Sequence, residues 1–228
     1  MSNSGFYDQI APRYDALRYG RAYDRSTAGM ELAYLERFLP RGRYLELGPG
    51  TGRVTELLLG HADALQAVDV SAGMLEQLRA RFPAAAALGT TVLDAAELPS
   101  IAGYGAFDCA VSMRVLPHLP DAGGILRLLA QAVRPGGTVV FDFWNSAGFD
   151  AVLKALRLRH RKVYTRYYGI GRMRAMIGAA GLEVVATRGY GYPPLRPLLV
   201  LDRAGGPLLR LFAQRVLWVC RRPGGGAG

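Results

Sequence analysis

The chain has 228 residues, half of them hydrophobic, which is enough for a single domain with a sizeable core. Its two cysteines, Cys109 and Cys220, stand far apart in strand-like segments, which argues against a disulfide framework or a metal cluster. No apolar run reaches the ~18 residues of a membrane span and no targeting leader opens the chain, so we expect a reduced, cytoplasmic protein.

Charge is unevenly distributed along the chain. Residues 1–150 contain 13 basic and 16 acidic side chains, whereas residues 151–228 contain 15 basic and 2 acidic ones. This asymmetry suggests that the C-terminal part meets something anionic. The alternative is a solvated basic surface, because nearly all basic residues are arginines in a chain rich in alanine and glycine.

The first ~20 residues predict a mobile lid. The stretch FYDQIAPRYDALRYG is aromatic and amphipathic, and Pro12 interrupts it. Since it precedes the first predicted strand, it can lie across the carboxyl edge of a sheet.

From residue 43 onward, strand-like and helix-like segments alternate. The strand-like runs are residues 43–47, 64–70, 90–94, 107–113 and 138–143. Helical spacing is clearest after Ser71, a plausible N-cap, and over residues 121–134, where RPGG ends the pattern. The alternation predicts a parallel sheet covered on both faces.

The rhythm changes after the helix that ends at Gly181. Strands are predicted at residues 182–190 and 214–220, separated by an apolar, basic insertion at 191–213. Two strands joined without a crossover helix can pair antiparallel at a sheet edge. We expect one domain over residues 1–222 and a flexible tail at 223–228.

The stretch YLELGPGTGR, residues 44–53, runs from a strand into a glycine turn. A dinucleotide turn would have a third glycine where Arg53 stands. Glu46 would repel a pyrophosphate but attract an ammonium or sulfonium group. Asp69 ends the next strand, where an acid takes ribose hydroxyls in nucleotide-binding folds. The site is predicted to bind a ribose without phosphates, as S-adenosylmethionine requires.

The sequence resembles the class I S-adenosylmethionine-dependent methyltransferases. The matching segments are LELGPGTGR, AVDVSAGML, VLDAAELP, FDCAVSMRVLPHLPD and VRPGGTVVFDFWN. The resemblance implies an α/β, Rossmann-like, seven-stranded sheet of order 3-2-1-4-5-7-6 with strand 7 antiparallel and helices on both faces. Residues 1–39 resemble the helical cap of small-molecule methyltransferases of the quinone-biosynthesis type.

The resemblance also implies a set of residues for the cofactor S-adenosylmethionine. They are Glu46, Gly48, Gly50, Gly52, Asp69, Val70, Met74, Asp94, Ala95 and Ser112. In this set Glu46 neighbours the ammonium group, Asp69 binds the ribose and Asp94 binds the adenine edge. For Met74, ordinary packing of helix against sheet is an equal alternative.

Methyl transfer from a sulfonium depends mainly on alignment and on exclusion of water, and a base is needed only for an acceptor proton of high pKa. The candidate catalytic residues are His118 and Tyr14, with structural roles as the alternative. The substrate candidates follow strands four and five, lie in the N-terminal cap or precede the last helix. They are Tyr7, Arg114, Trp144, Asn145, Tyr167 and Tyr168.

The C-terminal part suggests the acceptor class. Residues 154–174 contain eight basic residues and no acidic one, and leucines fill the insertion that follows. This predicts a small, anionic, lipid-like or natural-product acceptor, or peripheral contact with an anionic membrane. For the transfer itself we expect O- or N-methylation. The alternatives are a nucleic-acid methyltransferase, disfavoured because no Asn/Asp-Pro-Pro-Tyr/Phe tetrapeptide follows strand four, and a methyltransferase-like binding or regulatory module.

Overall fold

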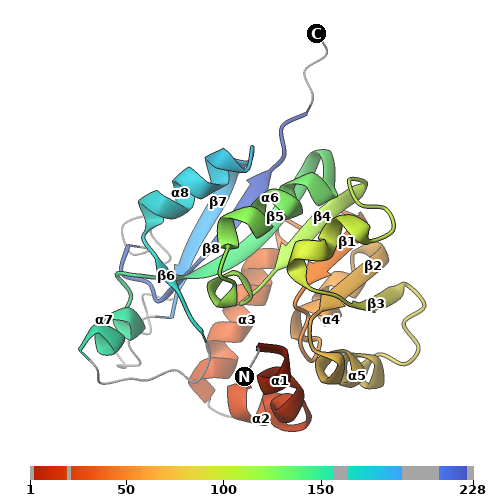
Figure 1. The fold of residues 1–228 in the computed structure, drawn as a ribbon, viewed down its shortest axis with the longest axis horizontal. Helices are drawn as coiled ribbons and strands as arrows, with labels where there is room; N and C mark the ends of the chain where they lie inside the picture. The colour runs from red at the N-terminus through yellow and green to blue at the C-terminus, as the bar shows by residue number, and fades with distance from the viewer. Residues whose placement is uncertain (1–2, 20–21, 157–163, 192–210, 225–228) are drawn as a thin grey trace.

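The computed structural model describes residues 3–19, 22–156, 164–191 and 211–224. A mixed sheet forms the centre of the molecule and helices cover both of its faces (Figure 1). The strands are β1 (Gly42–Leu47), β2 (Ala62–Asp69), β3 (Leu88–Val92), β4 (Phe107–Ser112), β5 (Val133–Asn145), β6 (Tyr167–Tyr168), β7 (Glu183–Tyr190) and β8 (Arg215–Arg221). The α-helices are α1 (Asn3–Ile10), α2 (Tyr14–Tyr19), α3 (Ala22–Glu36), α4 (Arg53–Leu59), α5 (Ala72–Arg81), α6 (Ala122–Ala132), α7 (Phe149–Ala155) and α8 (Ile170–Ala179). Short 3-10 helices are η1 (Ala11–Arg13), η2 (Ala95–Ser100) and η3 (Leu116–His118).

The strand order is β3-β2-β1-β4-β5-β8-β7, and β6 pairs with β5. Strands β1 to β5 pair in parallel, whereas β8 runs antiparallel to both β5 and β7. The predicted order of the seven main strands is therefore confirmed. The two-residue β6 raises the numbers of the last two strands by one.

The start of β5 differs from the prediction. The RPGG stretch was expected to end a helix before a strand at 138–143, yet β5 begins at Val133, directly after α6. Val133 pairs with Phe107 of β4. The Gly136 N–H donates to the carbonyl of Arg222, and the Arg222 N–H donates to the carbonyl of Gly137. Backbone pairing with β4 and with the end of β8 thus extends the strand through the glycines.

Alternate side chains of the central strands enter two separate cores. On β5, Phe141 and Phe143 pack with α6 and α8, whereas Val140 packs with α3 and α4. Since side chains alternate along a strand, Glu46 of β1 and Asp142 of β5 also face the side of α3 and α4. Two carboxylates therefore lie in a buried layer, where each needs a polar or charged partner.

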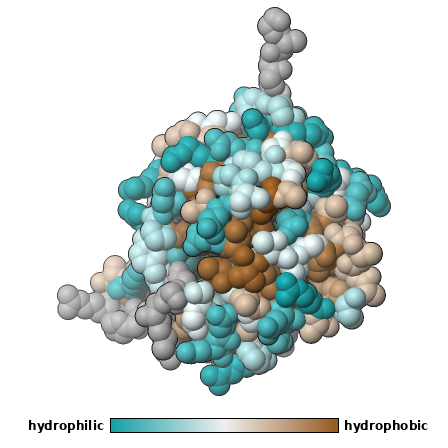
Figure 2. Space-filling model, turned by 45° about the vertical axis from the view of Figure 1, so that its right-hand side comes forward, coloured by the Kyte–Doolittle hydropathy of each residue, from teal (hydrophilic) through white to brown (hydrophobic). Residues whose placement is uncertain are grey.

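The domain limits proposed from the sequence fall partly outside the described residues. Helices α1 to α3 occupy the predicted cap at 1–39. Most of the predicted insertion at 191–213 and of the tail at 223–228 lies in segments that the structure does not describe, and these limits stay predictions. Within the described segments, no helix is long and apolar enough to cross a membrane. Figure 2 shows hydrophobic side chains gathered near the centre of one face, with mostly hydrophilic ones around them.

Candidate cofactor and acceptor site

A cavity opens at the carboxyl ends of β1, β2 and β4, beneath the N-terminal helices. It measures about 840 Å³ with the open solvent at its mouth included. Its lining residues are Tyr7, Tyr14, Glu46, Gly48, Pro49, Gly50, Thr51, Arg53, Val54, Asp69, Val70, Met74, Met113, Arg114, Val115, His118 and Leu119.

Gly50 and Gly52 of the turn after β1 have different surroundings. Gly50 lines the cavity with a φ of 56°, and a Cβ atom added to it would meet no atom within 4 Å. A Cβ on Gly52 would lie 2.6 Å from side-chain atoms of both Leu78 and Phe82. Gly50 therefore leaves room for a ligand. Gly52, absent from the cavity lining, lets the turn pack against α5 and its C-terminal end.

Glu46 lines the cavity and is 2% exposed. Its Oε2 accepts a hydrogen bond of 2.6 Å from the Thr55 hydroxyl. Burial raises the pKa of Glu46 to about 7, although the Thr55 hydrogen bond and the Arg53 charge act in the opposite direction. A positively charged ligand group beside this carboxyl would favour its ionised form.

Asp69 ends β2 on the other side of the glycine turn. Its two oxygens accept hydrogen bonds from the N–H groups of Gly50, at 3.3 Å, and Ser71, at 3.0 Å. Burial raises the pKa of Asp69, although these two hydrogen bonds act in the opposite direction. Two backbone donors thus fix a carboxylate in the cavity wall, where it can accept from ligand hydroxyls.

The residues predicted for the adenine divide into two groups. Val70 and Met74 line the cavity, whereas Asp94 and Ala95 do not. The Asp94 carboxylate is exposed and caps η2 by accepting from the Ala96 N–H at 2.9 Å, and Ala95 is buried in the core. The carboxylate that we expected at the adenine edge thus accepts a hydrogen bond from a nearby backbone N–H group. Ser112 is also absent from the cavity lining, and its fully buried hydroxyl has no hydrogen-bond partner within the described part of the chain.

The aromatic residues of the cap and His118 share the other end of the cavity. The Tyr7 ring lies 6.4 Å from the Tyr14 ring and 6.4 Å from the His118 ring, between centroids. His118 Nδ1 lies 2.8 Å from the Tyr164 carbonyl oxygen. Because a carbonyl cannot donate, Nδ1 carries the proton, and in the neutral ring Nε2 is the nitrogen with the lone pair.

Four predicted substrate residues do not line the cavity. The Asn145 amide donates to the carbonyls of Leu211 and Ala213, which secures the chain before β8. The remaining three residues pack against other side chains. Tyr168 packs edge-on against Phe143 in the core. The rings of Trp144 and Tyr167 also contact edge-on, and the Tyr167 hydroxyl donates to Asp150. As expected, Trp144 and Asn145 end β5 and Tyr167 and Tyr168 precede α8, but these side chains contact neighbouring segments of the protein.

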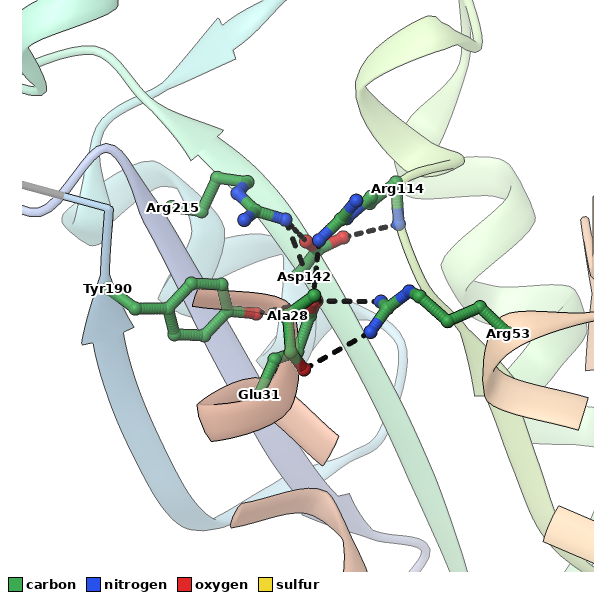
Figure 3. Close-up of polar contacts among 7 residues, drawn as sticks. All are labelled: Ala28, Glu31, Arg53, Arg114, Asp142, Tyr190 and Arg215. Carbon is green, nitrogen blue, oxygen red and sulfur yellow. Dashed lines mark hydrogen bonds and ion pairs between the residues drawn. The ribbon is translucent and has the colours of Figure 1, made fainter. Parts of the chain in front are cut away.

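Arg114 lines the cavity and belongs to a buried charge cluster (Figure 3). Glu31 of α3 contacts all three arginines of this cluster. Its Oε2 accepts from Arg114 at 2.6 Å and from Arg53 at 2.8 Å, and its Oε1 lies 3.6 Å from Arg215. Burial alone would raise the pKa of Glu31, but the three guanidinium groups together lower it to about 2.

Sequence reasoning missed most of this cluster. Its other members are Ala28, Arg53, Asp142, Tyr190 and Arg215. Asp142, a lone acid inside the apolar run VVFDFW, was a visible signal of a buried polar contact. Glu31 gave no such signal, because it stands in a helix whose partners come from residues up to 184 positions away.

The comparisons with known proteins agree with this geometry. The family model described as "Methyltransferase domain" matches residues 45–141, from β1 into β5. That span contains Glu46, Gly50 and Asp69, which line the cavity. Residues 45–141 belong to a methyltransferase domain.

The methyltransferase is 27% identical over 169 residues to the ubiquinone biosynthesis O-methyltransferase of Thiobacillus denitrificans, covering 70% of this chain and 72% of that protein. Its fold is similar to a methyltransferase of Haloferax volcanii solved with the activator Trm112, with a TM-score of 0.75, 18% identity and full coverage of both chains. It is also similar to the N-methyltransferase NodS of Bradyrhizobium japonicum, solved with S-adenosyl-L-homocysteine, with a TM-score of 0.69, 18% identity and coverage of 96% and 98%.

The cofactor of the methyltransferase is S-adenosylmethionine, and the residues present fit it. Gly50 leaves open space at the turn, and Asp69 is held in place to accept from ribose hydroxyls. Glu46 is a buried carboxyl that would be stabilised as an anion by an ammonium group. The chemistry of the donor set therefore matches the cofactor at its ribose and at its amino acid end.

Proposed function

We propose that this methyltransferase acts in the cytoplasm on a hydroxyl or amino group of a small-molecule acceptor. The observation that carries the proposal is His118, which lines the same cavity as Glu46, Gly50 and Asp69. A basic nitrogen and the residues proposed to bind the cofactor thus share one space, as methyl transfer to an acceptor that must lose a proton of high pKa requires.

When bound, S-adenosylmethionine supplies a methyl group on a sulfonium that an oxygen or nitrogen nucleophile can displace. His118 Nε2 takes the proton that the acceptor loses. The Tyr164 carbonyl accepts from Nδ1–H and favours the imidazolium that forms. Tyr7 and Tyr14 bring the cap over the cavity, where they keep water out and offer ring faces to the sulfonium.

The relatives support a small-molecule acceptor. The Thiobacillus denitrificans protein is named an O-methyltransferase and NodS an N-methyltransferase, so both kinds of acceptor atom remain within the proposal. The idea of a lipid-like acceptor or an anionic membrane surface came largely from residues 157–163 and 192–210, which lie outside the described segments. Of that apolar stretch, the described Leu211 and Phe212 are 42% and 65% exposed.

The test incubates the protein with labelled S-adenosylmethionine and separated small-molecule, RNA and protein fractions of a cell extract. Methyl uptake in the small-molecule fraction, followed by NMR of the product, identifies the acceptor and the methylated atom. Gly50→Ala is the inactive control, since its Cβ would occupy the space left for the cofactor. His118→Gln should lower kcat by about 10²–10⁴-fold while S-adenosylhomocysteine still binds. Uptake into RNA, or cofactor binding without uptake by any fraction, would contradict the proposal.

A further inference from the structure

We propose that Arg114 recognises an anionic group of the carboxylate class on the methyl acceptor. This inference rests on the proposed function and names the acceptor's chemistry. The residues that hold Arg114 for this purpose are Glu31 and Asp142, both buried behind the cavity wall.

Arg114 occupies the acceptor end of the cavity. It comes just after β4, and η3 then brings His118 into the same wall. Its lining neighbours Met113, Val115 and Leu119 are apolar. One guanidinium in an apolar wall, near the proposed base, suits an acceptor with an apolar body and one anionic group.

The conformation of Arg114 is held by the structure around it. Its φ is 65°, and no other non-glycine residue of the described segments has a positive φ. Its backbone N–H donates to Asp142 Oδ1 at 2.5 Å, and its Nη2 donates to Glu31 Oε2 at 2.6 Å. A left-handed conformation of this kind costs free energy and persists because such contacts fix it, which is common at ligand sites. A guanidinium fixed in advance loses little entropy on binding.

The cluster around Arg114 has an excess of positive charge. It contains the guanidinium groups of Arg53, Arg114 and Arg215 and the carboxylates of Glu31 and Asp142 (Figure 3). Burial also raises the pKa of Asp142, which favours its neutral form. In a poorly solvated wall such an excess stabilises an incoming anion more than it would at the surface.

Arg53 stands at the cofactor end of the same cavity. It begins α4, its Nη1 donates to the Ala28 carbonyl at 3.2 Å, and its charge opposes the rise that burial causes in the pKa of Glu46. The carboxylate of the cofactor is therefore a second source of negative charge in this cavity. The two arginines allow the sources to be separated by experiment.

The test measures binding to the protein loaded with S-adenosylhomocysteine. The probes are two carboxylates, 4-hydroxybenzoate and octanoate, each compared with its neutral amide. The wild type should bind at least one carboxylate roughly tenfold more tightly than its amide. Arg114→Gln should remove this preference, and Arg114→Lys should keep part of it. Glu31→Gln should weaken the preference for the carboxylate without changing the affinity for the amide. Arg134→Gln, which removes an arginine paired with Asp108 outside the cavity, should change nothing.

Three outcomes would overturn the inference. One is equal affinity of the wild type for carboxylates and amides, and another is binding of neither. The third is an Arg114→Gln variant that loses affinity for S-adenosylhomocysteine but not for its decarboxylated analogue, because the anion at Arg114 would then be the cofactor's own. A wild type that fails to bind S-adenosylhomocysteine at all would instead refute the proposed function.

Discussion

Glu46 combines burial with a carboxyl group that is predicted to ionise when the ammonium group of the cofactor lies beside it. Removing a carboxylate from water is unfavourable unless hydrogen bonds or positive charges replace the lost hydration. Here the Thr55 hydroxyl and the Arg53 charge replace only part of it, so the pKa remains at about 7. The folded protein therefore holds a proton at Glu46 between pH 4.5 and 7, where an unfolded chain has already lost it. Through this group alone, stability falls as the pH rises across that window.

The same pKa predicts the pH dependence of cofactor binding. Below pH 7 the ammonium group of S-adenosylhomocysteine meets a neutral Glu46, so the affinity should rise roughly tenfold between pH 5.5 and 7.5 and then level off. Calorimetry at several pH values measures this rise. Glu46→Gln should bind more weakly and with a flatter profile. Glu56→Gln, which removes an exposed carboxylate from the same strand–turn–helix unit, should behave like the wild type. A wild-type affinity that does not change with pH would show that Glu46 has no part in binding the ammonium group.

Among single residues, short-range spacing was the reliable guide. Glu46, Gly48 and Gly50 reach the cavity because a strand, a turn and a helix follow one another within a few residues. Asp94 lies outside the cavity lining and caps its own backbone, a local contact that the sequence pattern VLDAAELP did not reveal, and its role at the adenine stays a prediction. The Glu31 cluster was missed because its contacts join segments far apart in the chain.

At the scale of elements, α1 is attached to α5 next to Asp69, the carboxylate predicted to bind the ribose. Asp8 Oδ1 accepts from the Ser71 hydroxyl at 2.6 Å and from the Gly73 N–H at 3.0 Å, so the first helix adds a carboxylate to the N-terminus of α5. In η1 and α2, the chain continues to Asp15, which accepts from the Thr51 hydroxyl at 2.5 Å. Two hydrogen-bonded carboxylates thus connect the predicted lid to the walls of the cavity.

Asp8→Ala should release α1 and leave the sheet intact. The variant loses two hydrogen bonds to a charged acceptor, and S-adenosylhomocysteine should dissociate several-fold faster because the cap then covers the cavity less often. Stopped-flow fluorescence measures the dissociation rate, and limited proteolysis near Tyr7 reports on the helix. Asp63→Ala, an exposed carboxylate at the opposite end of β2, serves as the control. If both variants release the product at the wild-type rate, Asp8 does not secure the lid.

The element pattern also shows where sequence reasoning was sound. Strands and helices with strong apolar periodicity were predicted close to their observed bounds, and the capping role of Ser71 in α5 is confirmed by its bond to the Met74 N–H. The exceptions are segments formed by tertiary pairing. The start of β5 depends on β4 and β8, and β6 exists only because Tyr167 and Tyr168 pair with the end of β5.

For the molecule as a whole, Glu31 is the point where distant parts of the chain meet. It joins α3 to residues that follow β1 and β4, and to the ends of β7 and β8 through Tyr190 and Arg215. Truncating it would leave buried guanidinium groups without their shared carboxylate.

Glu31→Ala should lower the free energy of unfolding by about 3–5 kcal/mol, measured by urea denaturation at pH 7. The pKa of Glu31 is lowered from 4.5 to about 2, so its contribution is fully present above pH 4.5 and is lost as the pH falls toward 2. Glu36→Ala, at an exposed position of the same helix, should change stability by less than about 0.5 kcal/mol. Equal stabilities of the two variants would mean that the cluster does not hold these segments together.

The position of β8 inside the sheet has a consequence for how the protein is made. Residues 42–145 supply β1 to β5, which can pair as soon as they leave the ribosome, but β5 and β7 join only through residues 215–221. Until those residues emerge, the nascent chain presents an unpaired apolar edge along β5, and β7 lacks β8, the strand with which it pairs in the described part of the chain. Open strand edges of this kind promote aggregation and attract chaperones. Slow translation between residues 145 and 215 would prolong this exposure, and the last strand ends it by filling both edges at once.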